Sequence, residues 1–163
     1  GIIMMVGTAF NATNSIYIFK NLTEGNNEHI KKKLLFQIKI MSILFFAVTT
    51  LCILFSFLII RFAIPKYNDA IPFLFPLCFM GFFQCVYYLF VNFLFFFNET
   101  KTLMYITFSV SIIHLLLSYI LTRYSSLYTA YLGLLSGIII CALVIWQSNK
   151  IYPLLKLKMK KYE

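Results

Sequence analysis

Four long apolar runs dominate the sequence and limit what it can fold into. They cover residues 36–61, 71–97, 103–121 and 127–146. A helix needs about 20 apolar residues to cross the ~30 Å hydrocarbon layer of a membrane, and each run supplies roughly that length. A water-soluble domain of 163 residues has too little polar surface to cover four such segments. The sequence therefore predicts an all-α, polytopic transmembrane helix bundle.

The residues before the first run are typical of the end of another helix. Residues 1–10 are apolar but only half as long as a span, and residues 11–15 are polar. The basic segment and small-residue cleavage site of a signal peptide do not occur here. We therefore expect four parts. Residues 1–19 are the end of a truncated transmembrane helix, residues 20–35 a basic cytoplasmic link, residues 36–146 the four-span bundle, and residues 147–163 a basic cytoplasmic tail.

The basic residues predict the orientation, because cytoplasmic loops of membrane proteins carry an excess of Lys and Arg. If the chain crosses at every run, one side receives eleven of them: Lys20, Lys31, Lys32, Lys33, Lys39, Lys101, Lys150, Lys156, Lys158, Lys160 and Lys161. The other side receives three, Arg61, Lys66 and Arg123. Both ends of the chain are therefore expected in the cytoplasm. The net charge of +9 then reflects topology and attraction to anionic membrane lipids, not binding of nucleic acid.

Groups that could support catalysis or metal binding are few and scattered. Asp69 and Glu99 fall at span ends on opposite membrane faces, Glu24 and Glu28 in a loop, and Glu163 at the end of the sequence. Acid–base and nucleophilic catalysis need such groups within reach of one another. The four cysteines lie inside spans without metal-ligand spacing and are expected to act as small apolar residues: Cys52, Cys78, Cys85 and Cys141. We predict no enzymatic activity, no cofactor and no metal site.

Polar side chains inside two neighbouring spans are more informative, because they are costly in lipid and usually face a bundle interior or a cavity. In the run 103–121 and just after it they follow steps of three and four residues, which is one helical face: Thr107, Ser111, His114, Ser118 and Thr122. In the run 71–97, Gln84, Tyr88 and Asn92 repeat every four residues, with Tyr87 beside them.

Two interpretations of these stripes stay open. They form hydrogen bonds between helices, each worth about 0.6 kcal/mol on average, or they line a hydrophilic cavity that binds a substrate. The candidate cavity-lining set is Gln84, Tyr87, Tyr88, Asn92, Ser111, His114 and Ser118. His114 also suits a proton-coupled role, since histidine changes protonation near neutral pH.

Glycine and proline residues predict where helices approach and bend. Gly133 and Gly137 form a pattern of small residues four apart, which lets another helix come close. Pro65 and Pro72 lie at the outer entrance of the second run, whereas Pro76 lies deeper and is expected to bend its helix. A bent helix beside a polar stripe is a common feature of transporters.

A series of features along the chain carries a resemblance to a known family. They are the polar helix end 11–17, the stretch 24–28 followed by Lys31, Lys32 and Lys33, the outer loop 67–70 (Tyr-Asn-Asp-Ala), the inner turn 98–102, and Ala130 and Gly133 after a brief outer loop. In this order and spacing they resemble the polysaccharide flippases of the multidrug/oligosaccharidyl-lipid/polysaccharide exporter superfamily. The sequence departs from the family in lacking a proline near Asn14 and an Arg or Lys deep in its spans.

The resemblance implies the C-terminal lobe of a flippase in the bacterial cytoplasmic membrane, which works with the upstream half of the same protein. Such proteins move undecaprenyl-pyrophosphate-linked oligosaccharide to the outer leaflet for polysaccharide (O-antigen) biosynthesis. The cationic cavity for the pyrophosphate then lies mainly in the upstream half. Alternatives are a drug or cation antiporter of the same superfamily and a non-transporting membrane scaffold. A glycan polymerase normally needs a large outer loop, and neither outer loop here exceeds about ten residues.

Overall fold

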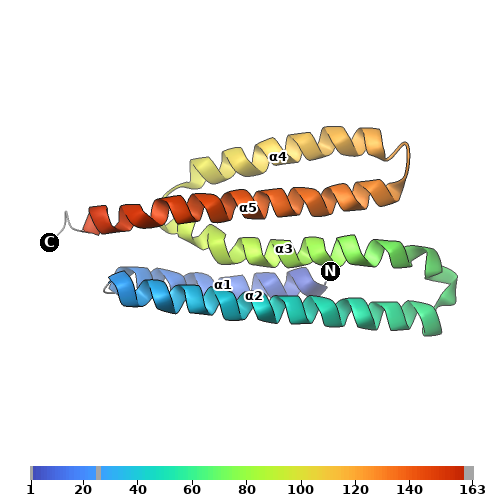
Figure 1. Cartoon of the computed structure of the whole chain (residues 1–163), viewed down its shortest axis with the longest axis horizontal. Helices are drawn as coiled ribbons and strands as arrows, with labels where there is room; N and C mark the ends of the chain where they lie inside the picture. The colour runs from blue at the N-terminus through green and yellow to red at the C-terminus, as the bar shows by residue number, and fades with distance from the viewer. Residues whose placement is uncertain (1, 25–26, 160–163) are drawn as a thin grey trace.

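Helices make up almost all of the part of the chain that the structure describes. The computed structural model describes the backbone of residues 2–24 and 27–159 and the side chains of residues 2–23 and 33–151. The long helices are α1 (Ile2–Glu24), α2 (Asn27–Leu58), α3 (Ile71–Phe96), α4 (Thr100–Leu121) and α5 (Ser126–Met159). A π-helix, η1 (Ile59–Ala63), and a 3₁₀-helix, η2 (Pro65–Ala70), join α2 to α3 (Figure 1). The predicted all-α class is confirmed.

Within the described residues, five helices are long and apolar enough to cross a membrane, where the sequence predicted four and the end of another. The additional one is α1, in which Ile2–Thr23 forms a candidate span of 22 residues. Two asparagines in its polar stretch bond to neighbouring helices. Asn11 pairs with Asn92 of α3, and Asn14 pairs with Gln37 of α2. Paired in this way, polar side chains fit inside a bundle, which the local polarity of the sequence cannot reveal.

The segments expected as link and tail are also largely helical. α1 continues to Glu24 and α2 already begins at Asn27, so little of the region 20–35 lies outside a helix. At the other end α5 continues beyond residue 146 to Met159. The turn between α3 and α4 is tight, as expected, and Asn98 adopts a left-handed φ of 58° there, which asparagine tolerates better than most residues.

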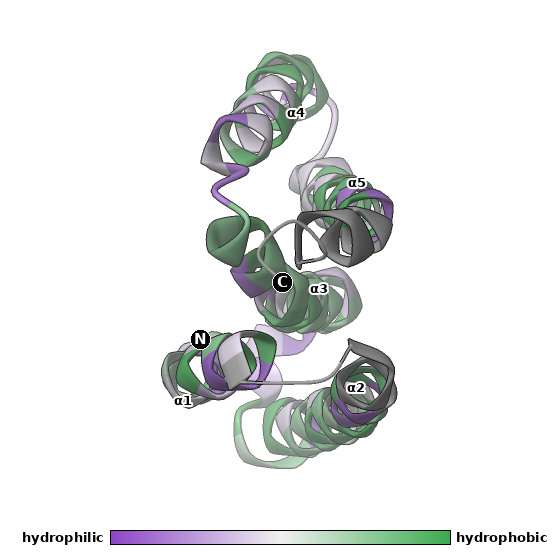
Figure 2. Ribbon diagram, turned by 90° about the vertical axis from the view of Figure 1, so that its left-hand side faces the viewer, coloured by the Kyte–Doolittle hydropathy of each residue, from purple (hydrophilic) through white to green (hydrophobic). Residues whose placement is uncertain are grey.

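α3 is the central helix of the bundle. It packs against α1 and α2 on one side and against α5 on the other, while α4 packs mainly against α5 (Figure 2). Buried side chains of α1, α2 and α3 form one part of the core, including Ile18, Leu34 and Phe93. A second part joins α3, α4 and α5 around Leu94 and Val144, neither of which is exposed. The central helix therefore holds two helix pairs together.

Proline positions in α3 match its geometry. Pro72 lies in the first turn, where the missing N–H is harmless. Pro76 is buried inside the helix, which continues through it to Phe96. The bend expected at Pro76 stays a prediction.

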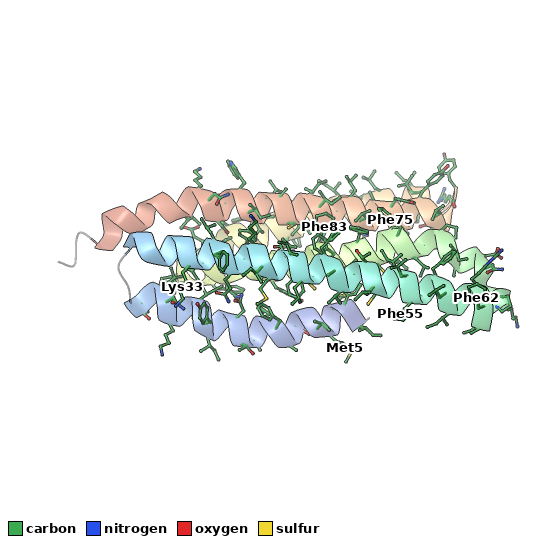
Figure 3. The ribbon with its side chains drawn as sticks, turned by 60° about the horizontal axis from the view of Figure 1, so that its bottom comes forward. Met5, Lys33, Phe55, Phe62, Phe75 and Phe83 are labelled. Atoms are coloured by element: carbon green, nitrogen blue, oxygen red, sulfur yellow. The ribbon has the colours of Figure 1, made fainter. Side chains whose placement is uncertain are left out.

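The surface of the bundle is rich in large apolar side chains. Met5 and Phe62, both more than 70% exposed, point away from the bundle in Figure 3. On α4, consecutive residues from Ile112 to Leu117 are exposed except for His114. Such a surface is unfavourable in water but matches the hydrocarbon of a bilayer. With five candidate spans, it identifies the chain as a helical membrane protein.

The helices run in alternating directions, which separates the basic residues between the two ends. The end of α1, the start of α2, the α3–α4 turn and the end of α5 lie together at the left in Figure 1. These segments contain or adjoin Lys20, Lys33, Lys101 and Lys150. The opposite end holds the α2–α3 and α4–α5 connections with Arg61, Lys66 and Arg123. That the lysine-rich end faces the cytoplasm stays a prediction.

Candidate functional site

A cavity of about 480 Å³ lies between α3, α4 and α5, with Met4 of α1 at its edge. Its polar lining consists of one amide, three hydroxyls and one imidazole: Gln84, Ser111, Ser118, Ser136 and His114. Four of the seven candidate residues from the sequence therefore lie around one cavity. That they bind a substrate stays a prediction.

His114 is the best-connected side chain of the cavity. Its Nδ1 lies 2.9 Å from Ser136 Oγ on α5, and Ser136 Oγ donates its own hydrogen to the Leu132 carbonyl at 2.9 Å. Its Nε2 lies 3.3 Å from Ser118 Oγ. Both ring nitrogens therefore have a hydroxyl partner, and the tautomer decides which of them donates.

The sequence left open whether the polar stripe bonds helices together or lines a cavity, and the position of His114 fits both. The bond to Ser136 ties α4 to α5, which is packing, and the same ring borders the cavity. Gln84, across the cavity on α3, forms no side-chain hydrogen bond with the described part of the chain, so its amide is available to a ligand.

Two glycines on α5 border the cavity and face α3 and α4. A Cβ added at Gly133 would lie 3.3 Å from Met80 Sδ of α3 and 3.9 Å from His114 Cε1 of α4. A Cβ at Gly137 would lie 3.8 Å from both Met80 and Phe83. Larger side chains at these two positions would fill the space that now forms the cavity.

The three remaining candidates do not line this cavity. Asn92 is only 2% exposed, and its Nδ2 donates to Asn11 Oδ1 at 2.8 Å and to the Tyr88 carbonyl at 3.1 Å. Tyr87 and Tyr88 are half-buried beside the core cluster that contains Leu94 and Val144, with their ring centroids 5.7 Å apart. Their contacts are those of packing residues.

Helical geometry explains why one stripe stays together and the other divides. Each residue turns the helix by about 100°, so two steps of four turn it by about 80° beyond full turns. Asn92 therefore faces α1 although Gln84 faces the cavity. On α4 the step of three between Ser111 and His114 offsets the following step of four, so Ser111 and Ser118 stay aligned.

Sequence reasoning missed Ser136 as a polar lining residue. It lies between Gly133 and Gly137, and this segment was interpreted only as a packing motif.

The two threonines at the ends of the polar stripe on α4 do not line the cavity. They bond to carbonyls of their own helix, Thr107 to that of Leu103 and Thr122 to that of Ser118. Thr122 also bonds to Thr129 of α5 at 3.0 Å.

A second cavity, of about 650 Å³, lies between α1, α2 and α3, and its lining, like that of the first, is mostly apolar. Its lining includes Cys52, Ser56 and Cys78, and it lacks the concentration of hydrogen-bonding groups found around His114. The first cavity is therefore the candidate functional site.

No group of three or more His, Cys, Asp or Glu side chains in the described residues could hold a metal ion.

No family model, curated protein or solved structure matches the chain.

Proposed function

We propose that this chain is part of a transporter of the polysaccharide flippase type. In this proposal the complete protein moves undecaprenyl-pyrophosphate-linked oligosaccharide across the bacterial cytoplasmic membrane for polysaccharide biosynthesis. The observation that carries the proposal is the cavity around Gln84 and His114, where an amide, an imidazole and three hydroxyls gather in an otherwise apolar lining within a bundle of candidate spans. Sugar hydroxyls both donate and accept hydrogen bonds, as do the amide and serine groups of this lining.

The composition of the lining also favours a glycan over a cationic drug. A cation in a low-dielectric cavity needs an opposing carboxylate, and the residues that line this cavity include no Asp or Glu. They include no Lys or Arg either. In this proposal the pyrophosphate is held mainly by the upstream half of the protein, while the lipid tail stays in the bilayer beside the apolar outer faces.

The test uses the full-length protein in its own host, with surface polysaccharide and the leaflet of the lipid-linked repeat units as readouts. Deletion should abolish surface polysaccharide and leave repeat units in the cytoplasmic leaflet. Gln84→Leu should lower export per molecule about two- to tenfold, the effect of one lost hydrogen bond of about 0.5–1.5 kcal/mol.

Asn92→Leu is the matched control, because Asn92 lies on the same helix but bonds to α1 instead of lining the cavity. It should lower the amount of folded protein and leave export per molecule unchanged. Equal export per molecule in wild type and Gln84→Leu would argue against the cavity as the glycan path. A deletion strain with normal polysaccharide but lost resistance to cationic drugs would favour the antiporter. No change in either property would favour the scaffold.

A further inference from the structure

Four amide side chains from three helices meet in the interior of the bundle, away from the cavity. They form two pairs, Asn11 with Asn92 and Asn14 with Gln37. Asn11 and Asn14 are three residues apart on α1, so the pairs lie on adjacent turns where α1 faces α2 and α3. We call these four residues the amide cluster.

The two pairs differ in how well they satisfy their polar atoms. In the first, Asn92 Nδ2 donates to both Asn11 Oδ1 and the Tyr88 carbonyl. In the second, Gln37 Nε2 donates to Asn14 Oδ1 at 3.0 Å. Asn14 Nδ2 and Gln37 Oε1 are both buried and have no partner in the described part of the chain. The whole Asn14 side chain is only 4% exposed. Buried polar atoms in such a place are strongly unfavourable unless something bonds to them.

The chemistry of the two unpaired atoms restricts what can occupy this place. One is a donor and the other an acceptor, and exchanging O and N in both amides leaves one of each. A metal cation would be repelled by the amide hydrogens, whereas water accepts from one atom and donates to the other. The two atoms lie at most about 7.5 Å apart, given the amide dimensions and the bond between them, a span that one or two water molecules cover.

We infer that the pair Asn14–Gln37 is a buried hydration site, in which ordered water bridges α1 and α2 beside the central helix. The site is separate from the cavity and does not depend on the proposed transport function. Buried waters of this kind commonly bond to polar groups that the protein leaves unpaired.

Infrared difference spectroscopy of the full-length protein in nanodiscs tests this inference. Exchange of H₂O for H₂¹⁸O should shift a weakly hydrogen-bonded O–H stretching band in the wild type. The double variant Asn14→Leu/Gln37→Leu should lose this band, because no polar group remains to hold the water. Asn11→Leu/Asn92→Leu is the matched control and should keep it, since that pair is directly bonded.

Asn14→Ala/Gln37→Met serves as a second variant if the change to two leucines prevents folding, because methionine has a shape similar to glutamine and alanine adds no bulk. It too removes both amides and should lose the band. A band that survives in a folded variant without these amides would overturn the inference. So would a high-resolution map in which the two side chains form a second direct bond with no density between them. Stabilisation of the wild type by sodium chloride, but not by choline chloride, that disappears in the double variant would assign the place to a cation instead.

Discussion

His114 shows how a single residue can have structural and functional roles at once. Its ring spans two helices through Ser136 and also borders the cavity with Ser118. Each ring nitrogen has a hydroxyl partner, and the residues that line the cavity include no carboxylate. Donor and acceptor roles of an imidazole depend on where its protons lie. A change in the protons of this ring would therefore change the hydrogen bond to Ser118, which faces the cavity.

This arrangement predicts a difference between two substitutions at His114. Gln keeps one donor and one acceptor but cannot take up a proton, so His114→Gln should leave folded protein abundant and remove a pH-dependent component of export. Ser136→Ala removes the bond between His114 and Ser136, worth about 0.6 kcal/mol, and should keep the pH dependence. Export by quantified amounts of each variant, measured across a pH series, distinguishes them. An unchanged pH profile in His114→Gln would exclude the coupling role.

At the scale of elements, the contact between α1 and α3 depends on a glycine. A Cβ built on Gly7 would lie 2.5 Å from Cys85 Sγ, a separation that no real contact tolerates. Cys85 is fully buried, and its thiol points to the Ile3 carbonyl at 3.4 Å. Either α1 would move away from α3 or the thiol would have to rotate and lose this bond.

We therefore expect Gly7→Ala to lower the free energy of unfolding by about 1–3 kcal/mol, the usual effect of overpacking a core. Gly133→Ala is the control and should have a smaller effect, because the closest atom to its Cβ, at 3.3 Å, is in the flexible side chain of Met80 and its 3.9 Å distance to His114 is ordinary contact. Thermal unfolding in detergent measures both. Adding Cys85→Ala to Gly7→Ala should recover most of the loss. If it does not, the contact with Cys85 is not the cause.

The sequence predicts those elements that depend on local properties, and it cannot predict those that depend on contacts between residues far apart in the chain. Runs of apolar residues predict spans because the membrane acts on each helix separately, and all four runs became helices. That α1 is itself long and apolar enough for a candidate span was not recognised, since its asparagines are matched by partners 23 and 81 residues away. The stripe on α4 was predictable from local helical geometry. That Asn92 faces α1 and Ser136 faces His114 depends on how whole helices pack, which no local pattern contains.

At the scale of the whole molecule, both ends of the bundle carry features of membrane–water interfaces. At the lysine-rich end, Lys33 Nζ lies 5.6 Å from the ring centroid of Tyr17, and Lys150 Nζ lies 5.4 Å from that of Trp146. At the opposite end, Arg123 stacks over Tyr119 at 4.8 Å and donates to its hydroxyl. Aromatic rings concentrate at both interfaces of membrane proteins, whereas lysine excess marks the cytoplasmic one. The difference between the ends therefore lies in the number of cations.

This asymmetry predicts the accessibility of single cysteines in an otherwise cysteine-free full-length protein. Asn68→Cys and Ser126→Cys, in the connections at the lysine-poor end, should react with an impermeant thiol reagent in intact cells. Asn149→Cys, exposed near the end of the last candidate span, should react only after the membrane is permeabilised. The physical reason is that translocating the lysine-rich end would require moving most of the chain's positive charge across the membrane. Labelling of Asn149→Cys in intact cells, with Asn68→Cys and Ser126→Cys reacting only after permeabilisation, would reverse the orientation. In that case the proposed direction of transport through the cavity beside His114 would have to be abandoned.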